Sequence, residues 1–359
     1  MMSNHLKFIN LAHDVASKNL GKTFPNPTVG CVISKNNIII SKAVTSTTGR
    51  PHAEEIALKK AGKKAKGAIM YVTLEPCFHN SQNGSCADQI LRSGIKKIYI
   101  SCIDQDPRTK KKSISKLKKN KIKVITGIEK DKTISVNNFY FKSLKKKKPF
   151  TKVKMAISND NKIAWSNYKS KWISNSKSRA YVHSLREKTQ AILTTSKTIL
   201  KDNPRFTVRK KNKIIKNLNV IIIDKNLNIP LNINLLKNLH ERRVIIFTSK
   251  KNNKSQKLKQ LGCEIIEMKI VNNKFDLKKI FSYIYQLKIS DLMVEAGGIL
   301  FADLIKNNLV DEILLFKAPY IIGEKGVPVI EGNSLNNIKK KLLEMIKFDD
   351  NLYLKYAIK

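Results

Sequence analysis

The first 126 residues alternate between helical and extended patterns of hydrophobic positions. Phe8, Leu11, Ala12 and Val15 have the i, i+3, i+4, i+7 spacing of an amphipathic helix, and Gly21 follows as a stop signal. Apolar runs typical of strands lie at 29–33, 38–40, 70–74, 98–101 and 124–126, and helical stretches lie at 53–61 and 87–92. Strands that alternate with helices predict a layered α/β sandwich.

The same alternation starts again after a lysine-rich stretch. Four lysines at 145–148 precede Pro149, which indicates a solvated linker; a charged loop inside one domain is the alternative. Beyond it, strands are predicted at 153–157, 191–194, 220–223, 244–247, 292–294 and 312–316, a helix at 177–185, and a last strand in the alternating tail 351–358. We therefore predict two domains, 1–147 and 148–359.

Charge and composition narrow the classes of protein. The 359 residues include 70 Lys and Arg against 27 Asp and Glu, and a net charge of +43 is one indication of an RNA-binding or RNA-editing protein. The lysines, however, are spread over all predicted elements, and aromatic residues make up only 7%. We interpret the charge as a compositional bias that also suits a phosphorylated small substrate, and we expect no nucleic-acid partner.

Other broad features concern location and redox chemistry. No segment has the ~18 apolar residues of a membrane span, and "MMSNHLKFINLAHDV" lacks signal-peptide features, so we expect a cytoplasmic protein without a membrane partner. These features are compatible with a homo-oligomer and do not decide the oligomeric state. An odd, sparse set of five cysteines favours metal binding or simple burial over a disulfide framework.

A zinc site is indicated by "TLEPCFHNSQNGSC" together with "RPHAEE". Pro51 suits the first turn of a helix, which would place His52 and Glu54 at its start, and Cys86 opens another predicted helix, where thiolate is favoured. His52, Cys77 and Cys86 would bind zinc and leave a fourth position for water, whose pKa zinc lowers from 15.7 towards ~7. Glu54 would then carry a proton, as in zinc-dependent deaminases.

Alternatives to this zinc site also exist for the single residues. A lone histidine is usually a hydrogen-bonded structural residue, and a lone cysteine a small buried one. His79 lies between the two cysteines and competes as a ligand. We leave it out because the His-x-Glu pair already supplies both the third ligand and a base.

The N-terminal half resembles the deaminase part of the bifunctional riboflavin-biosynthesis deaminase/reductase family. The resemblance rests on "NPTVGCVI", "PHAE" and "LEPC…C", and on eight residues between the cysteines, where nucleic-acid and cytidine deaminases usually have two. It implies a cytidine-deaminase-like α/β/α sandwich. It also implies zinc-hydroxide deamination of 2,5-diamino-6-ribosylamino-4(3H)-pyrimidinone 5′-phosphate, with Asn26 holding the pyrimidine ring.

This half departs from the family pattern in three places. Two histidines and a glycine after the first cysteine are replaced by 78–81, and glycine-containing patterns are replaced at 41–45 and 104–113. Since glycine amides can receive a phosphate, lysines 110–112 are expected either to substitute charge for those amides or to mark a vestigial deaminase. A protein that is only a reductase is therefore the alternative.

The C-terminal half lacks Gly-x-Gly-x-x-Gly but contains "VEAGGILFADLI", in which Gly297 and Gly298 open a helix that could receive a phosphate. With "KVKMAISNDNKIA", "SKWISN" and "LREKTQAILTTSKTILKDNPRFTVR", it resembles the reductase part of the same family. The resemblance implies a dihydrofolate-reductase-like α/β domain that uses NADPH to reduce the ribosyl group to ribityl.

The same resemblance implies the residues of the reductase site. The forked N–H donors of Arg186 and Arg209 suit a sugar phosphate, and the flat face of Trp172 suits packing against a cofactor. The structural alternatives are a surface ion pair for each arginine and a core anchor for the tryptophan. The implied NADPH contacts are Ala156, Trp172, Thr198, Asp202, Gly297, Gly298, Ile299, Leu300, Phe301, Ala302 and Asp303, and the implied substrate contacts are Ser170, Arg186, Phe206, Arg209 and Glu295.

Overall fold

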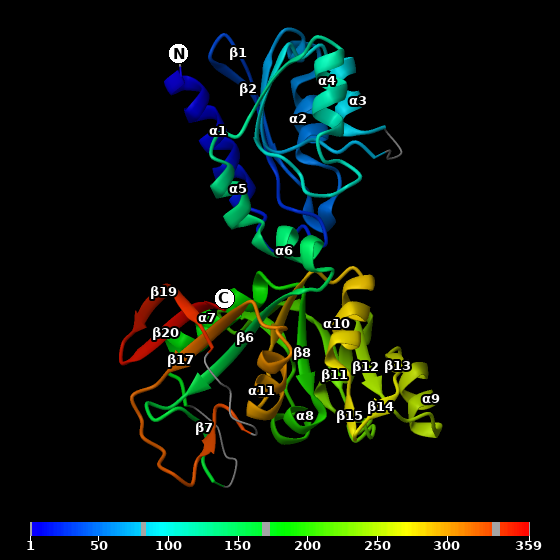
Figure 1. Ribbon diagram of the computed structural model, residues 1–359, viewed down its shortest axis with the longest axis vertical. Coiled ribbons are helices and arrows are strands. Elements are labelled where there is room, and N and C mark those ends of the chain that lie inside the picture. Colours follow the sequence, from blue (N-terminus) through cyan, green and yellow to red (C-terminus); the bar gives the residue numbers. More distant parts are fainter. Residues whose placement is uncertain (1, 80–83, 167–172, 332–337, 359) are drawn as a thin grey trace. The chain divides into compact units, whose positions relative to one another are not determined.

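The computed structural model describes residues 2–79, 84–166, 173–331 and 338–358. The chain divides into two compact units, Met1–Lys147 and Lys148–Lys359. Both units combine sheets with covering helices, so the predicted α/β class is confirmed (Figure 1). No helix in the described part of the chain has the length and apolar character needed to cross a membrane.

The first unit is built on a five-stranded sheet in the order β2-β1-β3-β4-β5. β1 pairs antiparallel with β2 and β3, whereas β3, β4 and β5 are parallel. The strands are β1 (Gly30–Lys35), β2 (Ile38–Val44), β3 (Ile69–Leu74), β4 (Lys97–Cys102) and β5 (Lys123–Thr126). The helices are α1 (Met2–Ser17), α2 (Ala53–Ala61), α3 (Cys86–Ser93), α4 (Lys112–Lys119), α5 (Lys130–Val136) and α6 (Asn138–Lys146).

Helices cover both faces of this sheet. Helices α1 and α5 lie on one face, and α2, α3 and α4 lie on the other (Figure 1). The amphipathic spacing of α1 buries Phe8, Ile9 and Ala12 against the sheet. Because a Cβ at Gly30 would come 1.9 Å from the Ala12 carbonyl oxygen, only glycine lets α1 pack this closely on β1.

Two details of the first unit differ from the sequence-based expectation. Helix α2 begins at Ala53 with His52 as its N-cap, so Pro51 lies before the helix and not in its first turn. The lysine-rich stretch is not wholly a linker, because Lys145 and Lys146 form the last turn of α6. This helix is prolonged because its other face buries Phe139 and Tyr140.

The second unit is built, within the described residues, on a nine-stranded sheet in the order β13-β12-β11-β8-β16-β6-β17-β20-β19. The strands from β13 to β17 are parallel, and β20 and β19 continue the sheet antiparallel. They are β6 (Phe150–Ile157), β8 (Ala191–Thr195), β11 (Asn219–Ile223), β12 (Val244–Thr248), β13 (Glu264–Glu267), β16 (Asp291–Val294), β17 (Glu312–Lys317), β19 (Lys340–Phe348) and β20 (Asn351–Ile358).

Helices and short hairpins surround this larger sheet. The helices are α7 (Ser176–Glu187), α8 (Ser196–Asp202), α9 (Asn253–Gln260), α10 (Leu277–Gln286) and α11 (Gly298–Lys306). Short paired strands are β7 (Lys162–Ala164) with β18 (Val327–Pro328), β9 (Thr207–Lys210) with β10 (Lys213–Asn217), and β14 (Ile270–Val271) with β15 (Lys274–Phe275).

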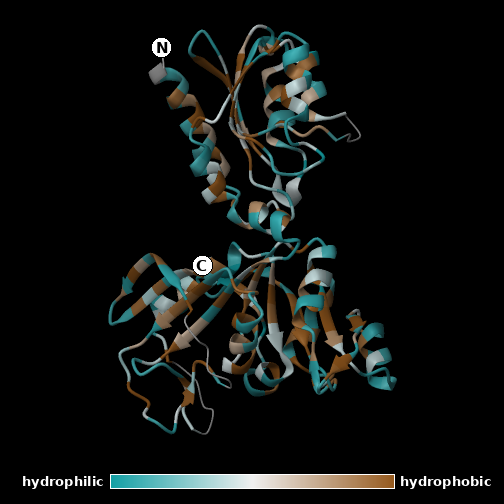
Figure 2. Cartoon of the chain, viewed as in Figure 1, coloured by the Kyte–Doolittle hydropathy of each residue, from teal (hydrophilic) through white to brown (hydrophobic). Residues whose placement is uncertain are grey.

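The central parallel strands of the second unit are apolar on both faces. One hydrophobic cluster includes Leu193, Ile221 and Leu304, and another includes Ile192 and Ile222 on the opposite face. Figure 2 shows the same contrast as hydrophobic colouring along the strands and hydrophilic colouring on the outer helices. Because parallel strands end at the same edge, loops after β6, β8, β11, β13 and β16 are gathered there.

Candidate active sites

Three potential zinc ligands meet in the first unit. The ligand atoms of His52, Cys77 and Cys86 all lie within 4.8 Å of one another. His52 is the N-cap of α2, Cys77 follows β3, and Cys86 is the first residue of α3, so three separate elements converge. One imidazole and two thiols match the donor set of a catalytic zinc site, in which a fourth position is left for water. The side chains therefore fit a zinc ion.

The pKa values of the two thiols are shifted in opposite directions. A hydrogen bond from the Cys86 thiol lowers the pKa of Cys77 to about 4, despite the burial of Cys77, with a further hydrogen bond from His52. The same hydrogen bond and burial raise the pKa of Cys86. The sequence favoured Cys86 as the thiolate because it starts a helix. The pKa is lowered at Cys77 and not at Cys86 because the Cys86 backbone N–H donates a hydrogen bond to the Cys77 Sγ, at 3.3 Å. The start of the helix therefore stabilises a negative charge on Cys77.

Glu54 lies beside these ligands in the first turn of α2. The residue is only 3% exposed, and burial raises the pKa of its carboxyl group, while the neighbouring His52 acts in the opposite direction. Its carboxyl group also interacts with the Cys86 thiol. A buried carboxyl group with a raised pKa is suited to accept and return a proton near neutral pH.

Asn26 lies in the loop before β1, close to the turn that leads to α2. Its Nδ2 donates a hydrogen bond to the Gly49 carbonyl oxygen at 3.0 Å. Gly49 has a φ of 87°, and a Cβ there would come 2.6 Å from the Asn26 Nδ2. The turn before His52 therefore holds the Asn26 amide in a defined orientation.

Glu75, which was not predicted from the sequence, holds the loop 104–113 in place by hydrogen bonds. Its carboxylate accepts hydrogen bonds from the Asp104 backbone N–H at 3.3 Å, the Lys111 backbone N–H at 3.0 Å and the Ser113 hydroxyl at 2.8 Å. The Lys111 amide is thus engaged within the protein. The signal that could have revealed Glu75 is its place two residues before Cys77, at the end of a buried strand.

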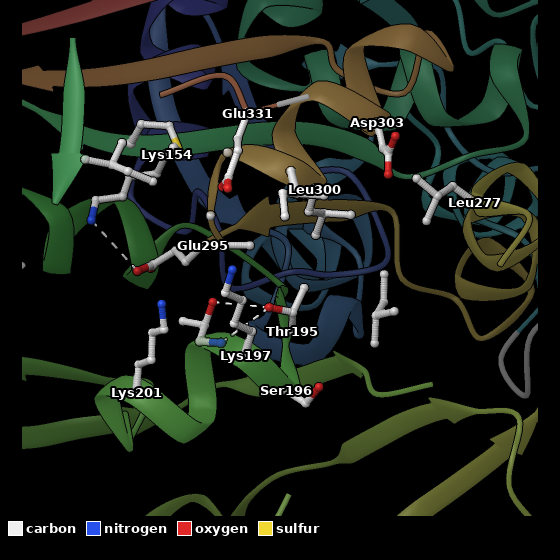
Figure 3. A pocket seen from close by; sticks show the side chains of 18 of the residues that line it. Lys154, Thr195, Ser196, Lys197, Lys201, Leu277, Glu295, Leu300, Asp303 and Glu331 are labelled. Atoms are coloured by element: carbon white, nitrogen blue, oxygen red, sulfur yellow. Dashed lines mark hydrogen bonds and ion pairs between the residues drawn. The ribbon is translucent and has the colours of Figure 1, made fainter. Parts of the chain in front are cut away.

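A large cavity lies in the second unit at the carboxyl edge of the parallel strands (Figure 3). Its volume is about 1520 Å³, above the roughly 300–1,000 Å³ of ordinary ligand pockets, so it can hold a cofactor and a substrate together. The predicted residues that line it are Ala156, Thr198, Asp202, Gly297, Gly298, Ile299, Leu300, Asp303, Arg186, Phe206 and Glu295.

Other residues predicted for this site lie elsewhere. Phe301 and Ala302 are buried in α11 and do not line the cavity. Arg209 is on β9, where its backbone N–H donates to the His183 Nδ1 at 3.2 Å, and only His183 of this pair lines the cavity. Trp172 and Ser170 fall outside the described residues.

A charged group forms the inner wall of the cavity. The Arg186 guanidinium donates two hydrogen bonds to the Glu295 carboxylate, at 2.7 and 2.8 Å, and lies 5.9 Å from the centroid of the Phe206 ring. Although burial opposes ionisation of Glu295, Arg186 lowers its pKa to about 2. Burial and the Arg186 charge lower the pKa of Lys154, whose Nζ is 4.0 Å from Glu295. Lys154 was missed because it reads as one polar position in an apolar strand.

The paired glycines have separate structural roles. A Cβ at Gly298 would come 2.9 Å from the carbonyl oxygens of Pro328 and Val329, so this glycine lets a neighbouring loop approach the start of α11. Gly297 has open space at the Cβ position and lines the cavity. The N–H groups at the start of the nine-residue α11 therefore border a space large enough for a phosphate-containing ligand.

Comparisons with known proteins identify both units. The family model "RibD C-terminal domain" matches residues 149–354, and "Cytidine and deoxycytidylate deaminase zinc-binding region" matches residues 2–102. The riboflavin biosynthesis protein RibD of Aquifex aeolicus is 37% identical over 93% of this chain and 94% of its own length. That of Buchnera aphidicola is 34% identical over 92% and 91%.

Solved structures agree over the full length. Acinetobacter baumannii RibD in form 1 has a TM-score of 0.91 at 29% identity, covering all of both chains. A Thermotoga maritima diaminohydroxyphosphoribosylaminopyrimidine deaminase/5-amino-6-(5-phosphoribosylamino)uracil reductase has a TM-score of 0.86 at 28% identity, covering 99% of each.

Proposed function

Because this chain belongs to the RibD family of riboflavin-biosynthesis deaminase/reductases, we propose that it carries out both reactions, deamination in its first unit and reduction in its second. The substrate is the diaminopyrimidinone ribosylamine phosphate, and the product of the first reaction is the substrate of the second. The observation that carries the proposal is the convergence of His52, Cys77 and Cys86 beside the buried Glu54.

Deamination replaces the 2-amino group of the pyrimidine by oxygen from water and releases ammonia. Zinc held by His52, Cys77 and Cys86 supplies Lewis acidity, which makes water acidic enough to react at neutral pH. Glu54 accepts a proton from the attacking water and delivers it to the departing amino group. Asn26, held by the Gly49 carbonyl oxygen, orients the pyrimidine ring.

Opening of the ribosylamine ring breaks the C1′–O4′ bond and leaves a C1′=N imine, and reduction then adds a hydride to C1′ and a proton to the nitrogen. NADPH supplies the hydride. Lys154 lines the cavity and has a lowered pKa, so it is suited to deliver the proton. Glu295 and Arg186 hold each other in place at the same wall, and Arg186 presents its remaining N–H donors to the substrate.

The alternatives are less well supported. A chain with only reductase activity has no need of the assembled metal ligands and buried Glu54. An RNA-editing protein does not fit a chain that matches RibD proteins across both units. We propose that the partners are small molecules, namely the pyrimidine ribosylamine phosphate and NADPH.

The test is to supply the diaminopyrimidinone phosphate with and without NADPH, and to follow ammonia and NADPH separately. Ammonia release without NADPH, followed by NADPH oxidation when the cofactor is added, supports both steps. If NADPH is oxidised only when the already deaminated compound is supplied, the deaminase proposal fails and the reductase alone remains.

A further inference from the structure

The wall of the reductase cavity holds Phe206 in an unusual backbone conformation. The segment from the end of α8 to β9 contributes Asp202, Pro204 and Phe206 to the cavity lining. Phe206 has a φ of 44°. This left-handed region is disfavoured for a bulky residue, because the Cβ crowds the backbone, and it persists only where surrounding contacts impose it. The neighbours of Phe206 therefore determine its conformation.

Arg242 binds both peptide groups that flank Phe206. Its Nη1 donates a hydrogen bond to the Arg205 carbonyl oxygen at 2.7 Å and a longer one to the Phe206 carbonyl oxygen at 3.4 Å. The first oxygen belongs to the peptide group before the Phe206 Cα, and the second belongs to the peptide group after it. Because φ and ψ describe the rotation of these two planar groups about that Cα, a donor that bridges both oxygens fixes both angles.

Arg242 is itself buried and held in place. It is 8% exposed, and its Nη2 donates to the Asn217 Oδ1. It directly follows a 3₁₀-helical segment, η3 (Asn234–Glu241), whose first residue binds the other end of the same loop, because the Asn234 backbone N–H donates to the Asn203 Oδ1 at 2.9 Å. Arg242 does not line the cavity, so it can act on the cavity only through the loop.

The conformation of Phe206 matters because its ring lies beside Arg186. The guanidinium carbon of Arg186 is 5.9 Å from the centroid of the ring, and both residues line the cavity. Phe206 also packs in a buried cluster with Val208 and Leu218. Because φ at Phe206 sets the direction of its Cβ, a different backbone conformation would carry the ring away from the guanidinium.

We infer that Arg242 is a positioning residue of the reductase: by fixing the backbone of Phe206, it keeps the aromatic ring beside Arg186 and that guanidinium directed at the substrate. The inference rests on the proposed reductase function and adds to it a residue outside the cavity. Phe206 and Arg186 are predicted substrate contacts, so loss of Arg242 weakens binding of the deaminated substrate more than binding of NADPH.

The test measures the reductase step of the full-length chain with the deaminated substrate. Arg242→Gln removes the forked donor, and Arg243→Gln, at the neighbouring residue that pairs with Glu264 on the surface, is the matched control. We expect Arg242→Gln to raise KM for the deaminated substrate about tenfold, with KM for NADPH changed by about twofold or less. Arg243→Gln should leave both values near those of the wild type, and calorimetry with the deaminated substrate should show the same difference in affinity.

A double-mutant comparison separates positioning from a general structural effect. In a Phe206→Ala background there is no ring to place, so the addition of Arg242→Gln should raise KM for the deaminated substrate little further. A further rise of about tenfold in that background, or equal rises in KM for the deaminated substrate and for NADPH, would overturn the inference. So would a folded Arg242→Gln variant with the wild-type KM.

Arg242→Lys covers the case in which the glutamine variant does not fold. The ammonium group keeps a charged donor but cannot span the carbonyl oxygens of Arg205 and Phe206 together with the Asn217 Oδ1, so KM for the deaminated substrate should rise by a smaller factor, about threefold. If only the lysine variant folds, a wild-type KM in it would overturn the inference and leave the reductase function intact. A wild-type protein that neither binds nor reduces the deaminated substrate would instead contradict the proposed function.

Discussion

Arg186 and Glu295 form a bidentate ion pair in the wall of the reductase cavity, with side chains only 17% and 11% exposed. In the same unit, Arg243 and Glu264 make a pair of similar geometry, at 2.7 and 2.9 Å, whose side chains are 43% and 38% exposed. The two pairs differ mainly in burial, so one serves as a control for the other.

We predict that Arg186→Met lowers the free energy of unfolding by about 3–5 kcal/mol, because it leaves the Glu295 carboxylate buried without its partner. Arg243→Met should cost about 1 kcal/mol or less, since water and salt screen the exposed pair. Urea unfolding of both variants measures the difference. Equal losses of unfolding free energy in the two variants would show that burial does not set the strength of these ion pairs.

The low pKa of Glu295 predicts a dependence of stability on pH. Because its folded pKa of about 2 lies below the usual 4.5, the ionised carboxylate stabilises the fold above the unfolded pKa, and this contribution is lost as pH falls from about 4.5 towards 2. A shift of that size corresponds to about 3 kcal/mol. Urea unfolding at several pH values should show a smaller acid loss in an Arg186→Met/Glu295→Met double variant than in the wild type. Identical pH profiles would exclude this role.

Replacing Glu54 by glutamine should stop deamination without removing zinc. The amide keeps the size of the side chain but cannot accept and return the proton, so ammonia release should fall about 100-fold or more. Metal analysis should still find zinc, and NADPH oxidation with the deaminated substrate should stay near the wild-type rate. A variant that releases ammonia normally would show that another group carries the proton.

Removing the metal should separate the two activities. A Cys77→Ser variant loses the thiolate with the lowered pKa, so we expect little zinc by metal analysis and little ammonia release. Because the reductase cavity lies in the other compact unit, its turnover of the deaminated compound should persist. A parallel loss of reduction would show that zinc also supports the second unit. Lys59→Gln, an exposed change on α2, controls for altered surface charge.

Local sequence patterns predicted much of the deaminase site. His-x-Glu at the start of one helix and a cysteine at the start of another have positions set by short-range rules, and the structure brings both near Cys77. The charge state of the cysteines was not predictable in the same way, because it depends on the hydrogen bond from the Cys86 backbone to the Cys77 sulfur.

The sequence by itself determined the α/β alternation, the three candidate zinc ligands and the glycines at the start of α11, because each depends on residue type and local spacing. Only the tertiary structure decided that Glu75 holds the loop 104–113 and that Lys154 of β6 and Glu295, which follows the neighbouring strand β16, line one cavity. Strand order and register arise from packing between distant segments, and a lysine in a strongly basic chain has no local feature that distinguishes a binding residue from a solvated one.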